Sequence, residues 1–420
     1  MKWPVTNIST LCVPTGQRDP TATPDACFRY IDIASVDKDA KRITNAIEVR
    51  GAEAPSRARK EVRAGDVLVS TVRPNLNAVA RVPDDLHGQI ASTGFCVLRA
   101  NRKLSDGKFL FYRCLTPEFI NFLVSQMRGA NYPAVSDGVV KRADIPCPAL
   151  KEQNRIAELL EQADRLRQQR NEVDEMTARI QPTLLHKMFG DPNTNSKGWP
   201  KQTLGSTGAA VRYGLGQPPQ SSDRGLPLIR ATNIHRGVIT ADDMIYVRRE
   251  DVPESRNAFL KAEEVIVVRS GAYTGDIAQV TEKWAGSVAG YDLVVSPGEK
   301  FTGEFLESYL LTPLIQQNYF GNIKARAGQP HLNADQVLDT PMMVPPRPLQ
   351  EQFSRFVGTL RHQQVKRSES GKYLNRLFST MLHRAFTGEL TAKWREAHLK
   401  ELLVEMEHQA KLLRTAAETN

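Results

Sequence analysis

The sequence predicts an α+β protein with two tandem domains, each built on a mostly antiparallel, curved sheet, that are separated and joined by two long helices. Three observations predict this class. The chain of 420 residues exceeds the size of one hydrophobic core, sequence features recur about 200 residues apart, and a helical apolar spacing follows each recurrence. We expect boundaries at residues 1–150, 151–190, 191–346, 347–388 and 389–420, the second and fourth segments being the long helices and the last a helical tail.

Matching segments recur in the same order along the two halves of the chain. Asp66-Val67-Leu68-Val69-Ser70 matches Glu264-Val265-Ile266-Val267-Val268, and Gly94-Phe95 matches Gly290-Tyr291. Further matches join Thr116-Pro117 to Thr312-Pro313, Pro133 to Pro330, Glu152-Gln153 to Glu351-Gln352, and Leu185-His186-Lys187 to Leu382-His383-Arg384. All six offsets lie between 196 and 199 residues. This agreement predicts an internal duplication and a pseudo-twofold repeat of the fold.

In each globular copy the sequence predicts short strands followed by a helix. Apolar runs of strand length are broken by Gly, Pro, Asn and Asp, and one helical stretch lies near the end. The expected strands of the first copy are 30–33, 67–70, 78–82 and 95–98, and its helix is 108–127. Those of the second copy are 226–229, 265–269, 277–280 and 293–295, with a helix over 303–319.

A proline-rich joint ends each copy, and a helical period begins after it. Ile145-Pro146-Cys147-Pro148 and Val344-Pro345-Pro346-Arg347-Pro348 cannot continue a helix or a central strand. The following apolar residues alternate three and four apart, as in a coiled-coil seam, with the polar Arg170 and Thr177 at two positions. The predicted seam residues are Ile156, Leu159, Leu166, Val173, Ile180 and Leu184 in the first helix, and Phe353, Phe356, Leu360, Leu374, Leu377 and Met381 in the second.

Two helices with similar seams, each nearly 40 residues long, are expected to pack against each other as an antiparallel pair. The alternative is that each packs on its own domain. Pro182 should kink the first helix near its end. The stretch 390–420 is also helical in pattern, has no counterpart after the first helix, and is either a docking surface or a solvated tail.

The charge distribution permits nucleic acid as a partner without requiring it. The net charge is +9 and the isoelectric point is near 9.3. Residues 1–150 hold 21 Lys and Arg against 15 Asp and Glu, whereas residues 191–346 hold 15 against 17. If the second domain binds DNA, it must therefore do so through a local patch.

Cysteine and histidine usage predicts neither disulfides nor a metal site. The five cysteines all lie in the first half and form no CxxC pair, which is typical of a reducing cytoplasm. The eight histidines are scattered without metal-ligand spacing. The N-terminal segment lacks the apolar core of a signal peptide, and no apolar run is long enough to span a bilayer, so we expect a cytoplasmic protein.

Catalytic motifs are weak or incomplete. Asp25 with Asp39-Ala40-Lys41 imitates the acidic pair and lysine of a metal-dependent nuclease, but Asp39 lacks an apolar strand to carry it. Gly214-Leu215-Gly216 runs into prolines, so no phosphate-binding helix can start there. An Asn-Pro-Pro-aromatic tetrapeptide, which adenine methyltransferases use to hold a flipped base, does not occur. We expect no catalytic residues and no cofactor in this chain.

Several sequence segments resemble those of the specificity (S) subunits of type I restriction–modification systems. Leu184-Leu185-His186-Lys187-Met188-Phe189-Gly190-Asp191-Pro192, followed by Asn195-Ser196-Lys197-Gly198-Trp199-Pro200, resembles their junction between the central helix and the second domain. The segments 148–153 and 348–352 resemble the openings of the two conserved helices, and 385–395 resembles the end of the second. Gly65-Asp66-Val67-Leu68-Val69-Ser70 and 228–234 are similar to phrases inside the family's domains. The resemblance covers almost the whole chain.

The resemblance implies that residues 1–150 and 191–346 are target recognition domains, each reading one half of a bipartite site in double-stranded DNA. It implies that the helices form a spacer and dock two methyltransferase subunits, which carry the S-adenosylmethionine chemistry, and that a motor and nuclease subunit can join. The S subunit itself is not an enzyme. A helix over 151–189 would be roughly 58 Å long at about 1.5 Å per residue, so several unread base pairs are expected between the halves.

Side chains that read bases should be donors or acceptors on loops, with Arg suited to guanine and Asn or Gln to adenine. Since Asn and Pro also shape turns, some candidates are expected to serve the loops themselves. Lys141, Arg142 and Lys324 are expected to contact phosphates. The candidate base readers are Arg73, Asn75, Asn77, Arg128, Asn131 and Tyr132 in the first domain, and Arg230, Asn233, Arg269, Ser270, Tyr273, Arg326, Gln329 and His331 in the second.

Two other functions fit the same architecture. One is a free-standing regulator that binds a bipartite site tightly by itself. The other is an orphan S subunit that assembles with the methyltransferase of another system and has no nuclease partner. An adjacent gene for a methyltransferase with the Asn-Pro-Pro-aromatic motif would favour the type I subunit.

Overall fold

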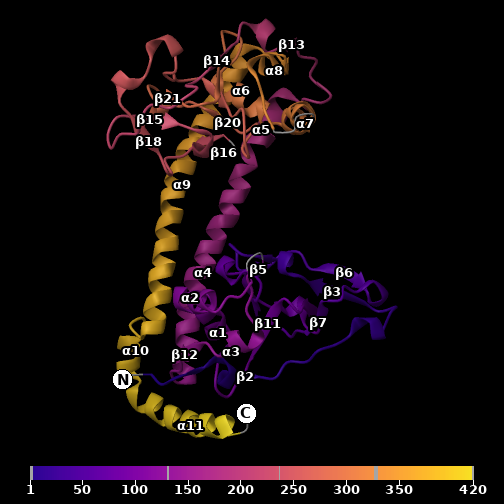
Figure 1. Ribbon diagram of the computed structural model, residues 1–420, viewed down its shortest axis with the longest axis vertical. Helices are drawn as coiled ribbons and strands as arrows, with labels where there is room; N and C mark the ends of the chain where they lie inside the picture. The colour runs from indigo at the N-terminus through magenta and orange to yellow at the C-terminus, as the bar shows by residue number, and fades with distance from the viewer. Residues whose placement is uncertain (1–2, 130–131, 236, 326–329, 419–420) are drawn as a thin grey trace. The chain divides into compact units, whose positions relative to one another are not determined.

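The computed structural model describes residues 3–129, 132–235, 237–325 and 330–418. The chain divides into two compact units, unit 1 (residues 1–171 and 370–420) and unit 2 (residues 172–369). Helices α4 (Leu150–Ala178) and α9 (Arg347–Thr387) each contribute one part to either unit (Figure 1). The predicted mixed fold, with open sheets and long helices, is confirmed.

Unit 1 contains two four-stranded sheets and two short strand pairs. The order of the first sheet is β2-β11-β8-β9 and that of the second is β6-β3-β10-β7, in which only β3 and β10 pair in parallel among the described strands. Strand β1 pairs with β12, and β4 with β5. The strands are β1 (Val5–Asn7), β2 (Cys12–Val13), β3 (Cys27–Ile31), β4 (Val36–Asp37), β5 (Arg42–Ile43), β6 (Ile47–Arg50), β7 (Ala58–Glu61), β8 (Val67–Ser70), β9 (Val79–Arg81), β10 (Ile90–Ser92), β11 (Phe95–Ala100) and β12 (Asp144–Pro146).

Unit 2 repeats much of this strand arrangement. Its four-stranded sheet has the order β14-β22-β19-β20, a three-stranded sheet has the order β18-β15-β21 with β15 and β21 parallel, and β13 pairs with β23 and β16 with β17. The strands are β13 (Lys201–Thr203), β14 (Ala210–Tyr213), β15 (Leu226–Ile229), β16 (Ile234–His235), β17 (Val238–Ile239), β18 (Ile245–Val247), β19 (Val265–Val267), β20 (Ile277–Gln279), β21 (Val288–Ala289), β22 (Leu293–Ser296) and β23 (Pro341–Met343).

Asp66 and Glu264, which precede β8 and β19, make the same kind of contact in the two units. Asp66 is almost fully buried and accepts two hydrogen bonds, at 2.8 and 2.9 Å, from Arg99 of β11. Glu264 is equally buried and accepts two, at 2.5 and 2.7 Å, from Arg212 of β14. Each carboxylate therefore ties the start of a central strand to another strand of its sheet.

The helical stretch expected at 108–127 is two helices, α1 (Gly107–Cys114) and α2 (Pro117–Ser125). The break arises because Thr116 caps α2 through its hydroxyl and Pro117 opens it. In unit 2 the expected helix 303–319 is likewise divided at Pro313 into α6 (Gly303–Leu310) and the π-helical η12 (Leu314–Tyr319), which continues into α7 (Phe320–Ala325). The short helices α3 (Asp137–Lys141) and α8 (Ala334–Leu338) lie near the ends of the two domains.

Within unit 1, the first part of α4 and the last part of α9 run antiparallel. Glu152 contacts Thr391 and Arg395, which follow α9, whereas Arg167, further along α4, stacks its guanidinium on the ring of Phe378. Ile156, Ala157 and Leu160 of α4 share one apolar core with Phe378, Leu382 and Ala385 of α9 and with the helices of the domain. The helices therefore pack on each other and on the domain at once.

The same order of contacts holds within unit 2. Helix α4 ends at Ala178 and α5 (Ile180–Phe189) begins after Arg179, which is where the ring of Pro182 would otherwise meet the carbonyl of residue 178. Thr177 accepts a hydrogen bond from Arg367, and Phe189 packs on Phe353 with ring centroids 5.4 Å apart. The sequence therefore located the kink near Pro182, three residues after the observed break.

The predicted seam needs a correction. Among its twelve members, Ile156 and Phe353 are buried and Leu159, Leu184, Leu360, Leu374 and Met381 are half-buried, but Leu166, Val173, Ile180, Phe356 and Leu377 are exposed. The buried positions are often neighbours of the predicted ones: Ala157, Leu160, Leu185, Val357, Phe378, Leu382 and Ala385. The reason is that each helix turns its apolar face toward a domain as well as toward the other helix.

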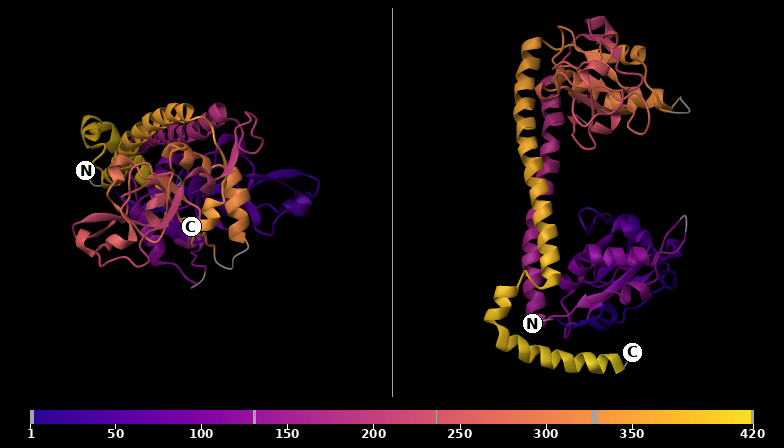
Figure 2. Two further views of the ribbon diagram at one scale, coloured as in Figure 1. Left: turned by 90° about the horizontal axis from the view of Figure 1, so that it is seen from above. Right: turned by 60° about the vertical axis from the view of Figure 1, so that its left-hand side comes forward.

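The C-terminal stretch is ordered on unit 1. After α9 the chain turns through α10 (Ala392–Ala397) into α11 (Leu399–Glu418), as Figures 1 and 2 show in yellow. Leu402 of α11 is fully buried, and Glu405 accepts a hydrogen bond from the backbone N–H of Lys151 at 3.1 Å. Helix α11 therefore covers the proline-rich joint at the start of α4.

Candidate DNA-recognition loops

In unit 1 the structure brings together two loops that the sequence singled out. The loop after β8 carries Arg73, and the loop after α2 carries Tyr132. The backbone N–H of Arg73 donates to the carbonyl of Pro133 at 2.8 Å, and Val72 forms a β-bridge with Ala134. The guanidinium of Arg73 lies 5.5 Å from the centroid of the Tyr132 ring. We call the described segments, 71–77, 128–129 and 132–135, the first loop pair.

Local backbone conformation shapes the first loop pair. Arg73 and Asn77 both adopt the left-handed region, with φ of 47° and 49°, on either side of the turn Pro74–Leu76. Lys41 donates to the Asn77 carbonyl at 2.5 Å, and burial lowers the pKa of Lys41 to about 8. Arg73, Asn75 and Tyr132 are exposed. The turn therefore holds three polar side chains out toward solvent.

In unit 2 the corresponding loops also meet. Ser270 forms a β-bridge with His331, and the N–H of Leu332 donates to the carbonyl of Arg269 at 2.8 Å. The hydroxyl of Thr274 donates to the carbonyl of Gly271 at 2.6 Å and lies 3.3 Å from that of Pro330. We call the described segments, 268–275 and 330–333, the second loop pair. Its place in unit 2 matches that of the first loop pair in unit 1, after the central strand and after the helical region.

Arg269 is the centre of the second loop pair. Its guanidinium lies 4.2 Å from the ring centroid of Tyr291 and 4.8 Å from that of Tyr213. It also lies within 3.3 Å of Nε2 of His331, which must accept from it because a guanidinium can only donate. The Nε of Arg269 is buried and finds no acceptor among the residues that the structure describes. The two tyrosine rings and His331 therefore hold the guanidinium of Arg269 in one orientation.

Tyr213 and Tyr291 were missed by the sequence analysis. Both are about half exposed, and Tyr213 reaches Arg269 from the end of β14, far away in the sequence. One signal pointed to Tyr291: it matches Phe95 in the duplicated Gly-aromatic pair, yet Phe95 is fully buried. A buried aromatic that becomes exposed in the other copy marks a position where the two domains diverge in function.

Beside the second loop pair lies a cavity of about 270 Å³ with a buried carboxyl group in its wall. The wall includes Arg230, Ser270, Tyr291 and Asp292. Asp292 is 3% exposed and accepts from the backbone N–H of Arg269 at 3.2 Å. Burial raises the pKa of Asp292 to about 6, against the opposing effect of that hydrogen bond.

Asn233 does not lie on the surface as predicted for a base reader, and Arg230 forms a hydrogen bond inside its own domain. Asn233 is fully buried, where its amide accepts from the N–H of Arg230 at 3.1 Å and donates to the carbonyl of Asp242 at 2.8 Å. It is therefore a turn-capping residue and does not offer its amide to a groove. Arg230 donates to the carbonyl of Asp243 at 2.6 Å, although it also lines the cavity.

The other candidates are dispersed around the loops. Arg128 and Arg142 are exposed, and Lys141 is half-buried at the end of α3. Tyr273 is exposed and packs edge-on against His235. Lys324 donates to the carbonyl of Thr274 at 3.2 Å, so it supports the second loop pair. Asn131, Arg326 and Gln329 lie outside the described residues.

The described residues bring together two loop pairs and little else that points to chemistry. They hold no cluster of three or more His, Cys, Asp or Glu side chains that could bind a metal ion. No helix among them combines the length and the apolar character needed to cross a membrane. Paired loops with Arg, Asn, Tyr and His side chains suit hydrogen bonding to base edges and backbone phosphates.

Comparisons with known proteins give the family to which the chain is similar. The family model of the type I restriction modification DNA specificity domain matches residues 61–175. The type I restriction enzyme EcoKI specificity subunit of Escherichia coli K12 is 22% identical over 72% of this chain and 69% of its own, and the MjaIX specificity subunit of Methanocaldococcus jannaschii is 20% identical over 86% and 96%.

A solved structure extends the comparison to the fold. A chain from a structure of complex assembly and conformational transition of the type I R-M system is 28% identical, with 93% of this chain and 98% of that chain covered and a TM-score of 0.51. Fold, loops and relatives together define a DNA sequence-specificity protein. The chain belongs to the family of type I restriction–modification specificity subunits.

Proposed function

We propose that this chain reads a bipartite, asymmetric target in double-stranded DNA, with the first loop pair on one half-site and the second loop pair on the other. The observation that carries the proposal is the guanidinium of Arg269, which the rings of Tyr213 and Tyr291 hold in one orientation beside the cavity. An Arg in this setting suits bidentate donation to guanine. The two loop pairs occupy matching places in similar sheets but carry different side chains, which suits two different half-sites.

The domain boundaries at 150, 190, 346 and 388 are part of the same proposal. The sheet β2-β11-β8-β9 of unit 1 and the sheet β14-β22-β19-β20 of unit 2 have equivalent strand orders, which supports an internal duplication. The order of contacts along α4, α5 and α9 within each unit supports an antiparallel pair of helices. Such a pair would present the two domains to DNA in inverted orientation at a fixed separation.

We also propose that the helices dock two methyltransferase subunits. Leu166, Val173 and Ile180 recur every seven residues on one helical stripe and are 58%, 39% and 44% exposed. Apolar side chains that repeat along one stripe and face solvent suit a protein partner. The methyltransferase would bind S-adenosylmethionine, restriction subunits could join the complex, and this chain would have no catalytic role. A cytoplasmic location fits its five free cysteines.

The test is methylation mapping with a methyltransferase from a type I system. The chain is expressed with and without that partner in a strain that lacks other modification, and methylated positions are mapped across the genome. We expect one bipartite motif only when both proteins are present, and copurification of two methyltransferase subunits per chain. Tight specific binding by the chain alone, with no methylation, would favour a free-standing regulator instead.

A further inference from the structure

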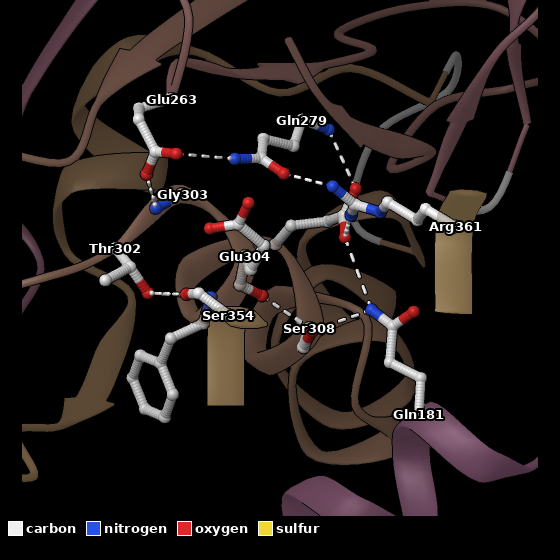
Figure 3. A network of polar contacts seen from close by, with 11 residues as sticks. Gln181, Glu263, Gln279, Thr302, Gly303, Glu304, Ser308, Ser354 and Arg361 are labelled. Carbon is white, nitrogen blue, oxygen red and sulfur yellow. Dashed lines mark hydrogen bonds and ion pairs between the residues drawn. The ribbon is translucent and has the colours of Figure 1, made fainter. Parts of the chain in front are cut away.

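A buried carboxylate joins the second domain to both of its helices. Glu307 of α6 has no exposed surface, and one of its oxygens accepts from the backbone N–H of Gln279 at 2.8 Å. The other accepts from Arg361 of α9 and lies 3.4 Å from the amide nitrogen of Gln181 of α5. Figure 3 shows Gln181, Gln279 and Arg361, which come from separate elements and point toward one another.

Secondary contacts hold the partners of Glu307 in place. Arg361 also donates to the side-chain carbonyl of Gln279, whose amide lies 3.3 Å from Glu263 (Figure 3). Glu263 accepts from the N–H of Gly303 at 2.7 Å, and Gln181 donates to the hydroxyl of Ser308 at 2.8 Å. The network therefore runs continuously from α5 and α9 through β20 to the start of α6.

Such a network is sensitive to geometry. Burial raises the pKa of Glu307, and the positive charge of Arg361 opposes that rise. Charge-assisted hydrogen bonds weaken when donors turn away, and an uncompensated buried charge is strongly unfavourable. A tilt of the domain on its helices would break several of these bonds together.

In unit 1, ring contacts join α1 to α9. Phe109 of α1 packs on Phe386 at 5.1 Å between centroids, and Tyr112 packs on Phe378 at 6.2 Å. Aromatic contacts of this kind tolerate a range of offsets and angles. Unit 2 therefore adds to its own ring contacts a charged network that reaches from both helices into the sheet.

We propose that Gln181, Arg361 and Glu307 are positioning residues that fix the orientation of the second domain on its helices, and so fix the number of base pairs between the two half-sites. This inference rests on the proposed function. Neighbouring base pairs lie about 3.4 Å apart along the duplex. Since a domain of this size has a radius of about 15 Å, a tilt of about 13° would move its loops by one base pair.

The test replaces Gln181, Glu307 and Arg361 by apolar side chains of similar size. The triple variant Gln181→Leu, Glu307→Leu, Arg361→Met removes both charges together, so it strands no buried ion and is expected to fold. With the methyltransferase partner it is offered duplexes that keep both half-sites and differ only in gap length. We expect wild type to methylate one gap length, and the variant to methylate gaps one base pair longer or shorter with a relative rate raised roughly tenfold.

The matched control is the pair Lys108→Met, Glu161→Leu, which removes the 2.6 Å contact between α1 and α4 in unit 1 and should leave the gap preference unchanged. If the triple variant fails to fold, the single variant Gln181→Leu is used instead. It removes the contacts of Gln181 with Glu307 and Ser308 and leaves the ion pair between Glu307 and Arg361 in place. We expect it to broaden the range of methylated gap lengths by less than the triple variant. A folded variant with the single gap of wild type would overturn the inference. Wild type that methylates no bipartite duplex would instead overturn the proposed function.

Discussion

Gln153 and Gln350 make the same set of hydrogen bonds in the two units. The amide nitrogen of Gln153 donates to the carbonyls of Leu104 and Pro148, both at 2.9 Å, and its oxygen accepts from Asp106 N–H at 3.2 Å. Gln350 donates to Lys300 and Pro345, at 2.9 and 2.8 Å, and its oxygen accepts from Thr302 N–H at 3.1 Å. The offset is 197 residues, whereas sequence matching had paired Gln153 with Gln352.

The first prediction concerns these buried amides. Gln350→Met removes two donors and one acceptor, and the carbonyls of Lys300 and Pro345 lose their partner. We expect a loss of about 2–4 kcal/mol in the free energy of unfolding, measured by urea denaturation. Gln352→Met, at an exposed position two residues away, should change it by less than about 0.5 kcal/mol. Equal losses of unfolding free energy in the two variants would argue against Gln350 as the counterpart of Gln153.

The second prediction concerns Arg269. Lysine keeps the charge but cannot stack between Tyr213 and Tyr291 or donate in a planar fork. Arg269→Lys should lower the methylation rate roughly ten- to hundredfold and relax discrimination in one half-site only, because a bidentate contact contributes about 1–3 kcal/mol. The measurement is methylation of duplexes substituted in either half. Arg249→Lys, which alters a comparable stack on Phe259, should have no effect; a loss of discrimination in both halves would argue against this placement.

The third prediction concerns Asp292 and pH. Its folded pKa of about 6 exceeds the ordinary 3.8, so the folded state binds the proton more tightly and stability falls as pH rises from about 4 to 6. Asp292→Asn keeps an acceptor for Arg269 and cannot ionise. Relative to wild type, this variant should gain stability as pH rises through that window, by about 3 kcal/mol at pH 7, since one pKa unit corresponds to about 1.4 kcal/mol. A difference that does not change with pH would contradict the assignment.

The fourth prediction concerns Glu152, a fully buried carboxylate in unit 1. It accepts from Trp3 at 3.1 Å, Thr391 at 2.6 Å and Arg395 at 2.7 Å. Arg395→Met should lower the free energy of unfolding by about 3–5 kcal/mol, because it leaves a buried charge without its counter-ion. Lys151→Met breaks only an exposed pair with Glu401 and should cost less than about 1 kcal/mol. Circular dichroism during denaturation would detect the difference; a near-neutral Arg395→Met would show that Arg395 does not stabilise the buried Glu152.

Much of the mixed fold was predictable because it follows from local patterns. The run at 67–70 and its match at 265–267 are strands because their apolar residues are buried on both faces of a sheet. The proline-rich joints marked the starts of both long helices for a similarly local reason. The breaks at Thr116-Pro117 and Thr312-Pro313 were also readable, since Thr before Pro is a helix start.

What the sequence could not show depends on contacts between distant segments. The exposure of Leu166 and Val173 could not be inferred from their spacing, because the spacing does not say whether a domain or a helix occupies each face. Tyr213 joins Arg269 only once β14 lies beside β22, and Glu307 meets Arg361 only in the folded unit. The loop pairs were predicted as segments, but their mutual contact was not.

The position of α11 has a consequence for how such genes can be rearranged. The amide of Gln409 lies 3.2, 3.3 and 3.0 Å from the carbonyls of Leu104 and Pro148 and the sulfur of Cys147, all within residues 1–150. Recombination that imports only this segment would place a foreign joint beneath the resident C-terminal helix. An exchange of 191–346 leaves those contacts intact. Exchanges of the first domain should therefore succeed more often when its C-terminal helix is exchanged with it.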